Sequence, residues 1–393
     1  MACTDNRVPV SPPQANLIES ALPSNTTDLA PLGKLIFFDQ NLSLNDNQSC
    51  ASCHAPEAGW TGALSSTNAH GAVYEGSIPG AFGARKPPSS AYATQSPIFH
   101  LSGVKKHAVF TGGMFWDGRA TGETLGSPTA EQAKGPFLNP VEQALPNAAD
   151  LVGRVCGASY GDDFRAAWGA SICDPANVNQ AYDAIGYSVS AFEGSSEVNA
   201  FTSKFDAFRA GQATLTREER RGWALFNGQA KCSGCHVGNG EHALFTDYTF
   251  DNIGLPQNPE NPAGLGFFDP GLGGFLEQRA DYSSYATANL GKHKVPTLRN
   301  VDLRSSSDFV KAYGHNGYFK TLYGIVHFYN TRDVLATCPG NYTEAQALAA
   351  DCWPAPEISQ NLNTAELGNL GLTESQEQAI VAFLKTLSDG YEP

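Results

Sequence analysis

The pattern of apolar and polar residues predicts regular helices at only a few places along the chain. The first falls at residues 29–38, where apolar residues recur at the three- and four-residue spacing of one helix face. These residues are Leu29, Leu32, Leu35 and Ile36. The residues before this stretch are polar and contain prolines, which indicates a tail rather than an element of the core.

Two further helices are predicted from the residues that cap them. Thr216 and Glu219 form a capping box ahead of an apolar stretch that reaches Phe226. Near the end of the chain, Thr373 and Gln376 precede a third amphipathic segment. Its apolar face comprises Ile380, Phe383, Leu384 and Leu387.

The first two predicted helices each precede a Cys-x-x-Cys-His motif, at residues 50–54 and 232–236. Two cysteines at this spacing form thioether bonds to the vinyl groups of one haem, and the adjoining histidine then becomes an axial ligand of the iron. Zinc sites and thioredoxin-like centres use the same cysteine spacing, but zinc ribbons keep their cysteine pairs within about 15 to 20 residues of each other. The sequence therefore predicts two c-type haems. Cys50, Cys53 and His54 hold the first, and Cys232, Cys235 and His236 hold the second.

The length of 393 residues allows two domains with separate cores, and the motifs place one haem in each half. We therefore expect a mainly α-helical fold of two cytochrome c-like haem domains, at residues 1–199 and 200–393. The 40 glycines and 24 prolines indicate long irregular loops. Residues 240–292 lack a regular apolar period, and we expect them to form a long loop over the second haem.

The formal net charge of −14 argues against nucleic acid or an anionic membrane surface as a partner. It suits a basic docking protein, although a solvated surface explains it equally well. The chain has no run of 18 apolar residues, so no membrane span is expected.

Five of the nine cysteines lie outside the two motifs. Cys156 and Cys173 bracket one short loop and Cys338 and Cys352 another, so each pair could close a disulfide worth about 3 kcal/mol, with buried free thiols as the alternative. Disulfides and attached haem both indicate an oxidising compartment, and we expect the bacterial periplasm. The start carries no signal peptide, so we expect an initiator methionine in its place. Cys3 follows a small residue, as at the end of a lipoprotein signal, although a free thiol explains it as well.

Several further motifs, spread from about residue 32 to the end of the chain, resemble those of the bacterial dihaem cytochrome c peroxidase and MauG superfamily. They are Phe115-Trp116-Asp117-Gly118-Arg119-Ala120, Gln132-Ala133-Lys134-Gly135-Pro136, Asn139-Pro140-Val141-Glu142, Pro296-Thr297-Leu298-Arg299-Asn300-Val301 and Gly314-His315-Asn316-Gly317. The resemblance implies that the first haem reacts with peroxide. It also implies that the final helix folds back onto the first domain.

The resemblance assigns roles to three residues near the first haem. Glu142 is the acid/base candidate, since a carboxylate near the iron can take a proton from one peroxide oxygen and return it to the other. Gln132 would orient peroxide or water on the same side. Without the resemblance, the segment at Glu142 is typical of a helix start with a favourable acid. Trp116 would lie between the haems and relay charge, or it is a packed core aromatic.

The far-side ligand of the second haem distinguishes the branches of this superfamily. Its peroxidases use a methionine there, which raises the haem's potential, whereas MauG has a tyrosine. The matching residue here is Tyr329. The chain's only methionines are Met1 and Met114, and we expect Met114 to pack in the core. A phenolate oxygen favours ferric and higher oxidation states. His327 is the alternative ligand if the segment is extended rather than helical.

Two other sites follow from the resemblance. Peroxidases of the family place a loop histidine where His70 stands, so His70 is either a ligand that blocks the first haem until reduction or a surface residue. The family also holds a calcium ion between its domains. Here Lys86 stands in the place of its asparagine ligand and residues 310–313 depart from the usual pattern, which leaves calcium only carbonyls and water.

The function expected from these features is that of a periplasmic enzyme that uses hydrogen peroxide to oxidise a partner protein, through a high-valent state shared by two haems. Residues 68–74 and the loop between Cys338 and Cys352 favour a MauG-like or MbnH-like member, which oxidises tryptophan residues of its partner. Two alternatives remain. One is a cytochrome c peroxidase that draws electrons from a small cytochrome, and the other is a non-enzymatic dihaem electron carrier.

Overall fold

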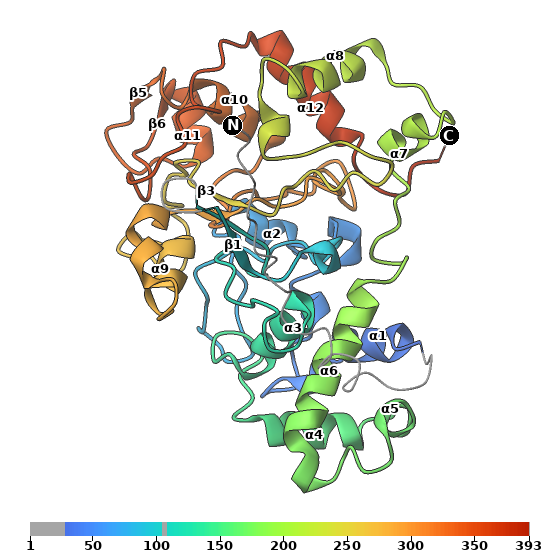
Figure 1. Ribbon diagram of the computed structural model, residues 1–393. Coiled ribbons are helices and arrows are strands. Elements are labelled where there is room, and N and C mark those ends of the chain that lie inside the picture. The colour runs from blue at the N-terminus through green and yellow to red at the C-terminus, as the bar shows by residue number, and fades with distance from the viewer. Residues whose placement is uncertain (1–27, 104–107, 393) are drawn as a thin grey trace, which may run out of the picture.

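The computed structural model describes residues 28–103 and 108–392. Helices form two groups at opposite ends of the molecule, with irregular chain and short strands between them (Figure 1). The lower group comprises α1 (Ala30–Phe38), α3 (Pro128–Leu138), α4 (Ala148–Gly157), α5 (Gly161–Trp168) and α6 (Val178–Glu193). The upper group comprises α7 (Lys204–Arg209), α8 (Arg217–Phe226), α10 (Leu322–Thr331), α11 (Glu344–Ala349) and α12 (Glu374–Lys385).

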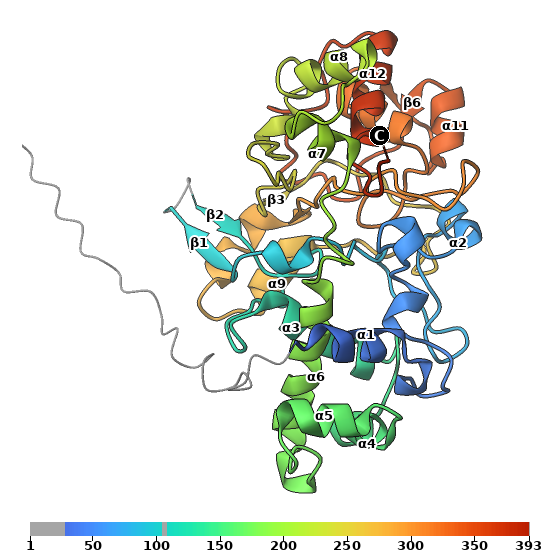
Figure 2. The same cartoon turned by 90° about the vertical axis from the view of Figure 1, so that its right-hand side faces the viewer.

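The part between the two groups contains α2 (Ser65–Ala69), α9 (Gly271–Glu277) and most of the strands (Figure 2). All strands are two or three residues long and pair two by two. β1 (His100–Ser102) pairs antiparallel with β2 (Val109–Thr111), β3 (Phe250–Asp251) antiparallel with β4 (His293–Lys294), and β5 (Ala336–Thr337) parallel with β6 (Cys352–Trp353). The expectation of a mainly helical fold with long irregular stretches is confirmed.

Each group of helices surrounds a hydrophobic core of its own. The lower core draws on residues between 32 and 198, and the upper core on residues between 205 and 387. The exact division of the chain at residues 199 and 200 stays a prediction.

The three helices predicted from the sequence are present as α1, α8 and α12. The capping boxes of Thr216 with Glu219 and of Thr373 with Gln376 are both formed. Each of these caps satisfies backbone N–H groups that the first helical turn leaves without partners.

The helix ahead of each motif crosses a later helix at a glycine. A Cβ on Gly33 of α1 would lie 1.8 Å from the carbonyl oxygen of Ser188 on α6, and a Cβ on Gly222 of α8 would lie 1.9 Å from that of Ala379 on α12. Only glycine allows helix backbones to approach so closely. The two crossings hold the Cys-x-x-Cys-His motifs against their respective cores.

The placement of the final helix differs from the expectation. α12 packs against α8 and α10 of the upper group and does not fold back onto the lower one. The close crossing at Gly222 gives the apolar face of α12 a partner within its own half of the chain. Only the residues after the helix reach back, where Asp389 accepts a hydrogen bond of 2.7 Å from the Tyr92 hydroxyl.

The expectation of one irregular loop at residues 240–292 is also wrong in part. This stretch contains β3, α9 and two short 3-10 turns, and it contributes to a third small core. The buried residues of that core are Phe99, Phe110, Phe250, Leu272, Leu276 and Ala286. Burial of Leu272 and Leu276 against β1 and β2 thus stabilises α9, although the glycines of this helix disfavour helix formation.

Both predicted disulfides are present. They join Cys156 to Cys173 and Cys338 to Cys352, with S–S distances of 2.05 and 1.98 Å. Cys3, with the lipid anchor considered for it, lies outside the described residues. Within the described residues, none of the helices is long and apolar enough to cross a bilayer.

Candidate functional site

The first motif lies in the wall of a cavity in the lower half of the molecule. Cys50, Cys53 and His54 line it together with the three residues to which the sequence assigned chemistry, namely Gln132, Glu142 and Trp116. The cavity has a volume of about 140 Å³. The structure thus brings all six predicted residues of the first site together.

The His54 imidazole is held through one of its two nitrogens. Nδ1 lies 3.2 Å from the carbonyl oxygen of Trp60 and 3.2 Å from the hydroxyl oxygen of Ser90. Burial lowers the pKa of His54 to about 4, so the ring is neutral at physiological pH. A neutral imidazole with Nδ1 engaged presents Nε2 as a metal ligand.

Glu142 lies on a turn just beyond α3. The prediction of a helix start at this segment, made without the family resemblance, is therefore wrong. Its backbone N–H donates to the carbonyl of Asn139, which ends the helix, at 3.0 Å. Burial raises the pKa of the Glu142 carboxyl, and the Asn139 side chain and Arg119 oppose that shift. A carboxyl with a raised pKa is suited to exchange protons near neutral pH.

Trp116 lines this cavity and also a second cavity, which contains the second Cys-x-x-Cys-His motif. It sits at the tip of a loop closed by Met114 and Ala120, and its indole N–H donates to the carbonyl oxygen of Lys86 at 2.8 Å. Its ring centroid is 6.5 Å from that of His315, which lines the second cavity. The indole therefore separates the two cavities, and it is a packed core aromatic as well.

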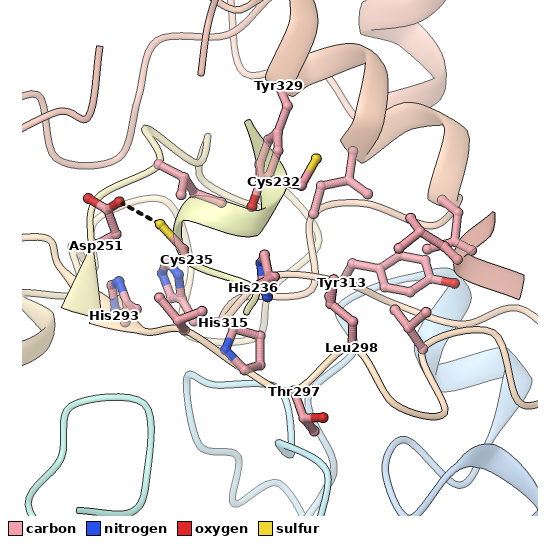
Figure 3. A pocket seen from close by; sticks show the side chains of 18 of the residues that line it. Cys232, Cys235, His236, Asp251, His293, Thr297, Leu298, Tyr313, His315 and Tyr329 are labelled. Carbon is pink, nitrogen blue, oxygen red and sulfur yellow. Dashed lines mark hydrogen bonds between the residues drawn. The ribbon is translucent and has the colours of Figure 1, made fainter. Parts of the chain in front are cut away.

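The second cavity is larger, with a volume of about 220 Å³. Cys232, Cys235 and His236 line it, and the Nδ1 atom of His236 lies 2.8 Å from the carbonyl oxygen of Phe245. Figure 3 shows Tyr329 extending from α10 toward the two cysteines, with its phenol oxygen directed to the motif. Burial, together with the nearby Cys235 and Cys232, raises the pKa of the Tyr329 phenol.

The alternatives to Tyr329 lie elsewhere. His327 is outside the second cavity, and its Nδ1 atom is 3.0 Å from Glu377. Since the segment is helical, residues two positions apart point in different directions. Met114 packs against Ala93 and Ala120, outside both cavities. Met1 lies outside the described residues.

His70 lies away from both cavities. It is exposed at the surface, where its Nδ1 atom lies 3.0 Å from a carboxylate oxygen of Glu260. Of the two roles considered for His70, its position is that of a surface residue.

The segments expected around calcium contain two buried lysine side chains, Lys86 and Lys311. Lys86 donates to the hydroxyl of Thr61 at 2.8 Å, and Lys311 donates to the carbonyls of Ala58, Asn300 and Leu303 at 2.8, 3.1 and 2.8 Å. Burial lowers the pKa of Lys86 to about 7 and that of Lys311 well below its usual range. The two lysine amino groups occupy the oxygen atoms that calcium would need, so the residues present do not fit a calcium ion.

A buried cluster of Asp269, His293 and His315 beside the second cavity was not predicted from the sequence. Asp269, His293 and His315 bring one ligand atom each to within 4.8 Å of one another, and Arg85 donates to Asp269 at 2.6 Å. His315 also lies 2.9 Å from Glu357. Asp269 and His315 lie in loops and His293 lies in β4, and their irregular spacing resembles no metal-binding motif.

The donor atoms of both cavities fit haem. Within the described residues the four motif cysteines are the only ones outside disulfides, and each pair lies beside a histidine whose Nδ1 atom is already engaged. A mainly helical protein with two such cavities, joined by one tryptophan, is a dihaem protein of the c-type cytochrome class.

Comparisons with known proteins identify the family. The model of the di-haem cytochrome c peroxidase family matches residues 27–214. Methylamine utilization protein MauG from Paracoccus denitrificans is 34% identical, over 97% of this chain and 94% of its own. Cytochrome-c peroxidase IdrP1 from Denitromonas iodatirespirans is 28% identical, over 92% of this chain and 82% of its own. The chain therefore belongs to the dihaem cytochrome c peroxidase family, and it is an oxidoreductase with peroxidase-type chemistry.

Solved structures agree with this assignment. The diheme peroxidase BthA from Burkholderia thailandensis is 32% identical, with a TM-score of 0.76 over 94% of this chain and 87% of its own. A MauG-like protein associated with microbial copper homeostasis has the same fold, with a TM-score of 0.65 at 24% identity over 99% of this chain and 96% of its own.

Proposed function

We propose that this protein is a periplasmic MauG-like or MbnH-like enzyme that uses hydrogen peroxide to oxidise a tryptophan of a partner protein. The observation that carries the proposal is Tyr329 in the second cavity, where a methionine would favour an ordinary peroxidase. The two disulfides support an oxidising compartment.

Each haem would be attached through the cysteines of its motif. Cys50 and Cys53 would form the thioether bonds of the first haem and Cys232 and Cys235 those of the second, with His54 and His236 as the axial ligands. When bound, the two haems supply redox chemistry, because they take up the oxidising equivalents of peroxide and deliver them to a substrate.

The residues of the first cavity would bind peroxide and move its proton. Gln132 orients peroxide by hydrogen bonding from its amide. Glu142 would accept the proton of one peroxide oxygen and return it to the other, so that the O–O bond breaks and one oxygen leaves as water, and the bound haems would supply the two electrons for this cleavage. The His54 ring stays in one tautomer because Trp60 and Ser90 hold Nδ1.

The second cavity would stabilise an oxidised state rather than store an electron. A thioether ligand favours the reduced metal, whereas a phenolate oxygen is a hard donor that favours higher charge. Deprotonation of Tyr329 requires a nearby cation, because burial raises its pKa. Trp116 lines both cavities and would carry charge between them.

The proposal is tested by adding one equivalent of peroxide to the resting holoprotein and recording optical and EPR spectra. In a tryptophan-oxidising enzyme, peroxide changes the haem spectrum. The changed spectrum then lasts many times longer than one turnover of an ordinary peroxidase. Tyr329→Phe removes this persistence while both haems stay attached. Tyr323→Phe is the matched control, since Tyr323 lies on the same helix but outside the cavity.

Two other results would contradict the proposal. Rapid turnover with reduced cytochrome c, dependent on prior reduction, identifies an ordinary cytochrome c peroxidase. A spectrum that peroxide leaves unchanged identifies an electron carrier.

A further inference from the structure

The axial histidine of the first site is held from behind by one turn of the chain, at residues 55–61. The carbonyl oxygen of Trp60 lies 3.2 Å from Nδ1 of His54. The turn is tight, because Gly59 has a φ of 73° and the backbone N–H of Trp60 donates to the carbonyl of Ala55 at 2.8 Å. The hydrogen bond to His54 therefore depends on what fixes this turn.

Two buried lysine side chains hold the turn on both sides of Trp60. The amino group of Lys311 donates to the carbonyl oxygen of Ala58 at 2.8 Å. The amino group of Lys86 donates to the hydroxyl of Thr61, also at 2.8 Å. Only 3% of Lys311 and 7% of Lys86 are exposed. Both contacts are thus part of the interior rather than of the surface.

Lys311 also connects this turn to the second half of the chain. Its amino group donates to the carbonyls of Asn300 at 3.1 Å and Leu303 at 2.8 Å. The Asn300 carbonyl lies so close to the turn that a Cβ on Gly59 would come within 2.8 Å of it. One amino group therefore joins a turn in the first half of the chain to two carbonyls in the second half.

Lys86 makes a second connection between the halves, through its backbone. Its backbone N–H donates to the carbonyl of His315 at 2.7 Å, and its backbone carbonyl accepts the indole N–H of Trp116 at 2.8 Å. Its amino group donates to the carbonyl of Pro87 at 2.9 Å as well as to Thr61. The residue that holds one side of the turn thus also holds the tryptophan between the two cavities.

The hydrogen bonds of the two amino groups fix the oxygen atoms that they reach. All of these acceptors are carbonyl or hydroxyl oxygens, so the contacts gain nothing from an ion pair. A buried polar group is stable only while its hydrogen bonds are made. Movement of the turn would leave buried N–H groups without acceptors, which is unfavourable.

We propose that Lys86 and Lys311 are positioning residues that act on His54 through this turn. They fix the Trp60 carbonyl as the acceptor of the Nδ1 proton. A firm acceptor at Nδ1 raises the basicity of the imidazole and strengthens the bond from Nε2 to the iron. The proposal rests on the haem attachment proposed above. The two lysines hold the halves together at the place where the resemblance implied a calcium ion.

The test is the resonance Raman spectrum of the reduced holoprotein, in which the iron–histidine stretching band reports the bond from His54 to the iron. The second haem, whose far side Tyr329 would close, would give no such band. In Lys86→Met and in Lys311→Met we expect the band to shift to lower frequency. Methionine fills a similar space but donates no hydrogen bond, so the turn loosens and the Nδ1 hydrogen bond weakens.

The two variants are independent of each other. Lys86→Met leaves the three hydrogen bonds of Lys311 in place, so it tests the proposal even if Lys311→Met does not fold. Lys320→Met is the matched control, because the Lys320 amino group also joins the halves but does so at the carbonyls of His70 and Gly317. It should leave the band unchanged.

The proposal is overturned if Lys86→Met and Lys311→Met both keep the wild-type frequency. It is also overturned if Lys320→Met shifts the band equally, which would indicate a general loosening of the two halves. A wild-type holoprotein without the band would overturn the proposed haem ligation, and this inference with it. The spectrum is recorded without peroxide and does not depend on the persistence measured above. Failure of the proposed function and failure of this inference are therefore separate results.

Discussion

Replacement of Glu142 by glutamine tests the acid/base step most directly. Glutamine preserves the size of the side chain but cannot take or release a proton. The first cavity contains one other carboxyl group within the described residues, Glu193, at the end of α6. Gln132, the other polar residue assigned to the peroxide side, cannot replace a base either.

The structure therefore predicts an effect in the upper part of the usual range. General acid/base catalysis contributes about 10²–10⁴-fold, and with no second base on the peroxide side we expect a loss of about 10³–10⁴-fold. This corresponds to an increase of about 4 to 5.5 kcal/mol in the activation free energy. The quantity affected is the second-order rate constant for the reaction of peroxide with the resting holoprotein.

The pH dependence of the same rate constant gives an independent check. Burial raises the pKa of Glu142 above the ordinary value of about 4.3. The base form is lost as the pH falls through the raised pKa, so the wild-type rate should decline on the acid side at a pH above 4.3. Glu142→Gln has no base to protonate, and this decline should be absent.

The assay is stopped-flow absorption at the haem bands over a series of peroxide concentrations and pH values. Glu57→Gln is the control, since Glu57 is close to the first motif in sequence but exposed, and its rate should match the wild type. A rate within about threefold of wild type for Glu142→Gln, or an unchanged acid decline, would refute the assignment.

Three further predictions concern stability. Gly33→Ala should lower the free energy of unfolding, measured by urea titration, by about 1–3 kcal/mol, because the new Cβ would lie 1.8 Å from a carbonyl oxygen. A loss under about 0.5 kcal/mol would contradict the close helix crossing. Added calcium or chelator should leave the melting temperature of the holoprotein unchanged, because Lys86 and Lys311 occupy the available oxygens, and a rise with calcium would disprove this. Replacement of Cys338 and Cys352 by serine should cost about 3 kcal/mol by the same titration, and equal stability would show that the bond does not constrain the unfolded chain.

The parts of the fold that the sequence predicted depend on local signals. Capping residues and apolar spacing located α1, α8 and α12, since both act within a few turns of helix. The helix α9 was missed because three of its first four residues are glycine. It is stabilised by burial of Leu272 and Leu276 against residues far away in the chain. The packing of α12 against α8 was not predicted, because it depends on a glycine contact that no local pattern in the sequence indicates.

The same distinction applies to the site. The haem motifs are contiguous, and the structure places both in cavities, with Gln132, Glu142 and Trp116 around the first. The choice between Tyr329 and His327 stayed open because two residues on one segment face the same side in a strand and different sides in a helix. The helical geometry of α10 places Tyr329 in the cavity. Lys311 had no local signal at all, because only the tertiary fold brings it near the first site.

The two halves share more local geometry than the Cys-x-x-Cys-His motif. A loop in each half is closed by the same pair of backbone contacts, Met114 with Ala120 and Tyr313 with Phe319, where the N–H to carbonyl distance is 2.8 Å in both. Trp116 and His315 occupy the same position in their respective loops, and their rings meet at 6.5 Å.

This correspondence explains why the chemistry of the halves must come from their side chains. Where the backbone repeats, a difference in reactivity can arise only from the groups placed on it. The first cavity carries an acid/base candidate in Glu142, whereas the second carries Tyr329. In the proposed reaction the first side would therefore open peroxide and the second would hold an oxidised metal. Trp116, in the wall that the two cavities share, would let the two act as one oxidant.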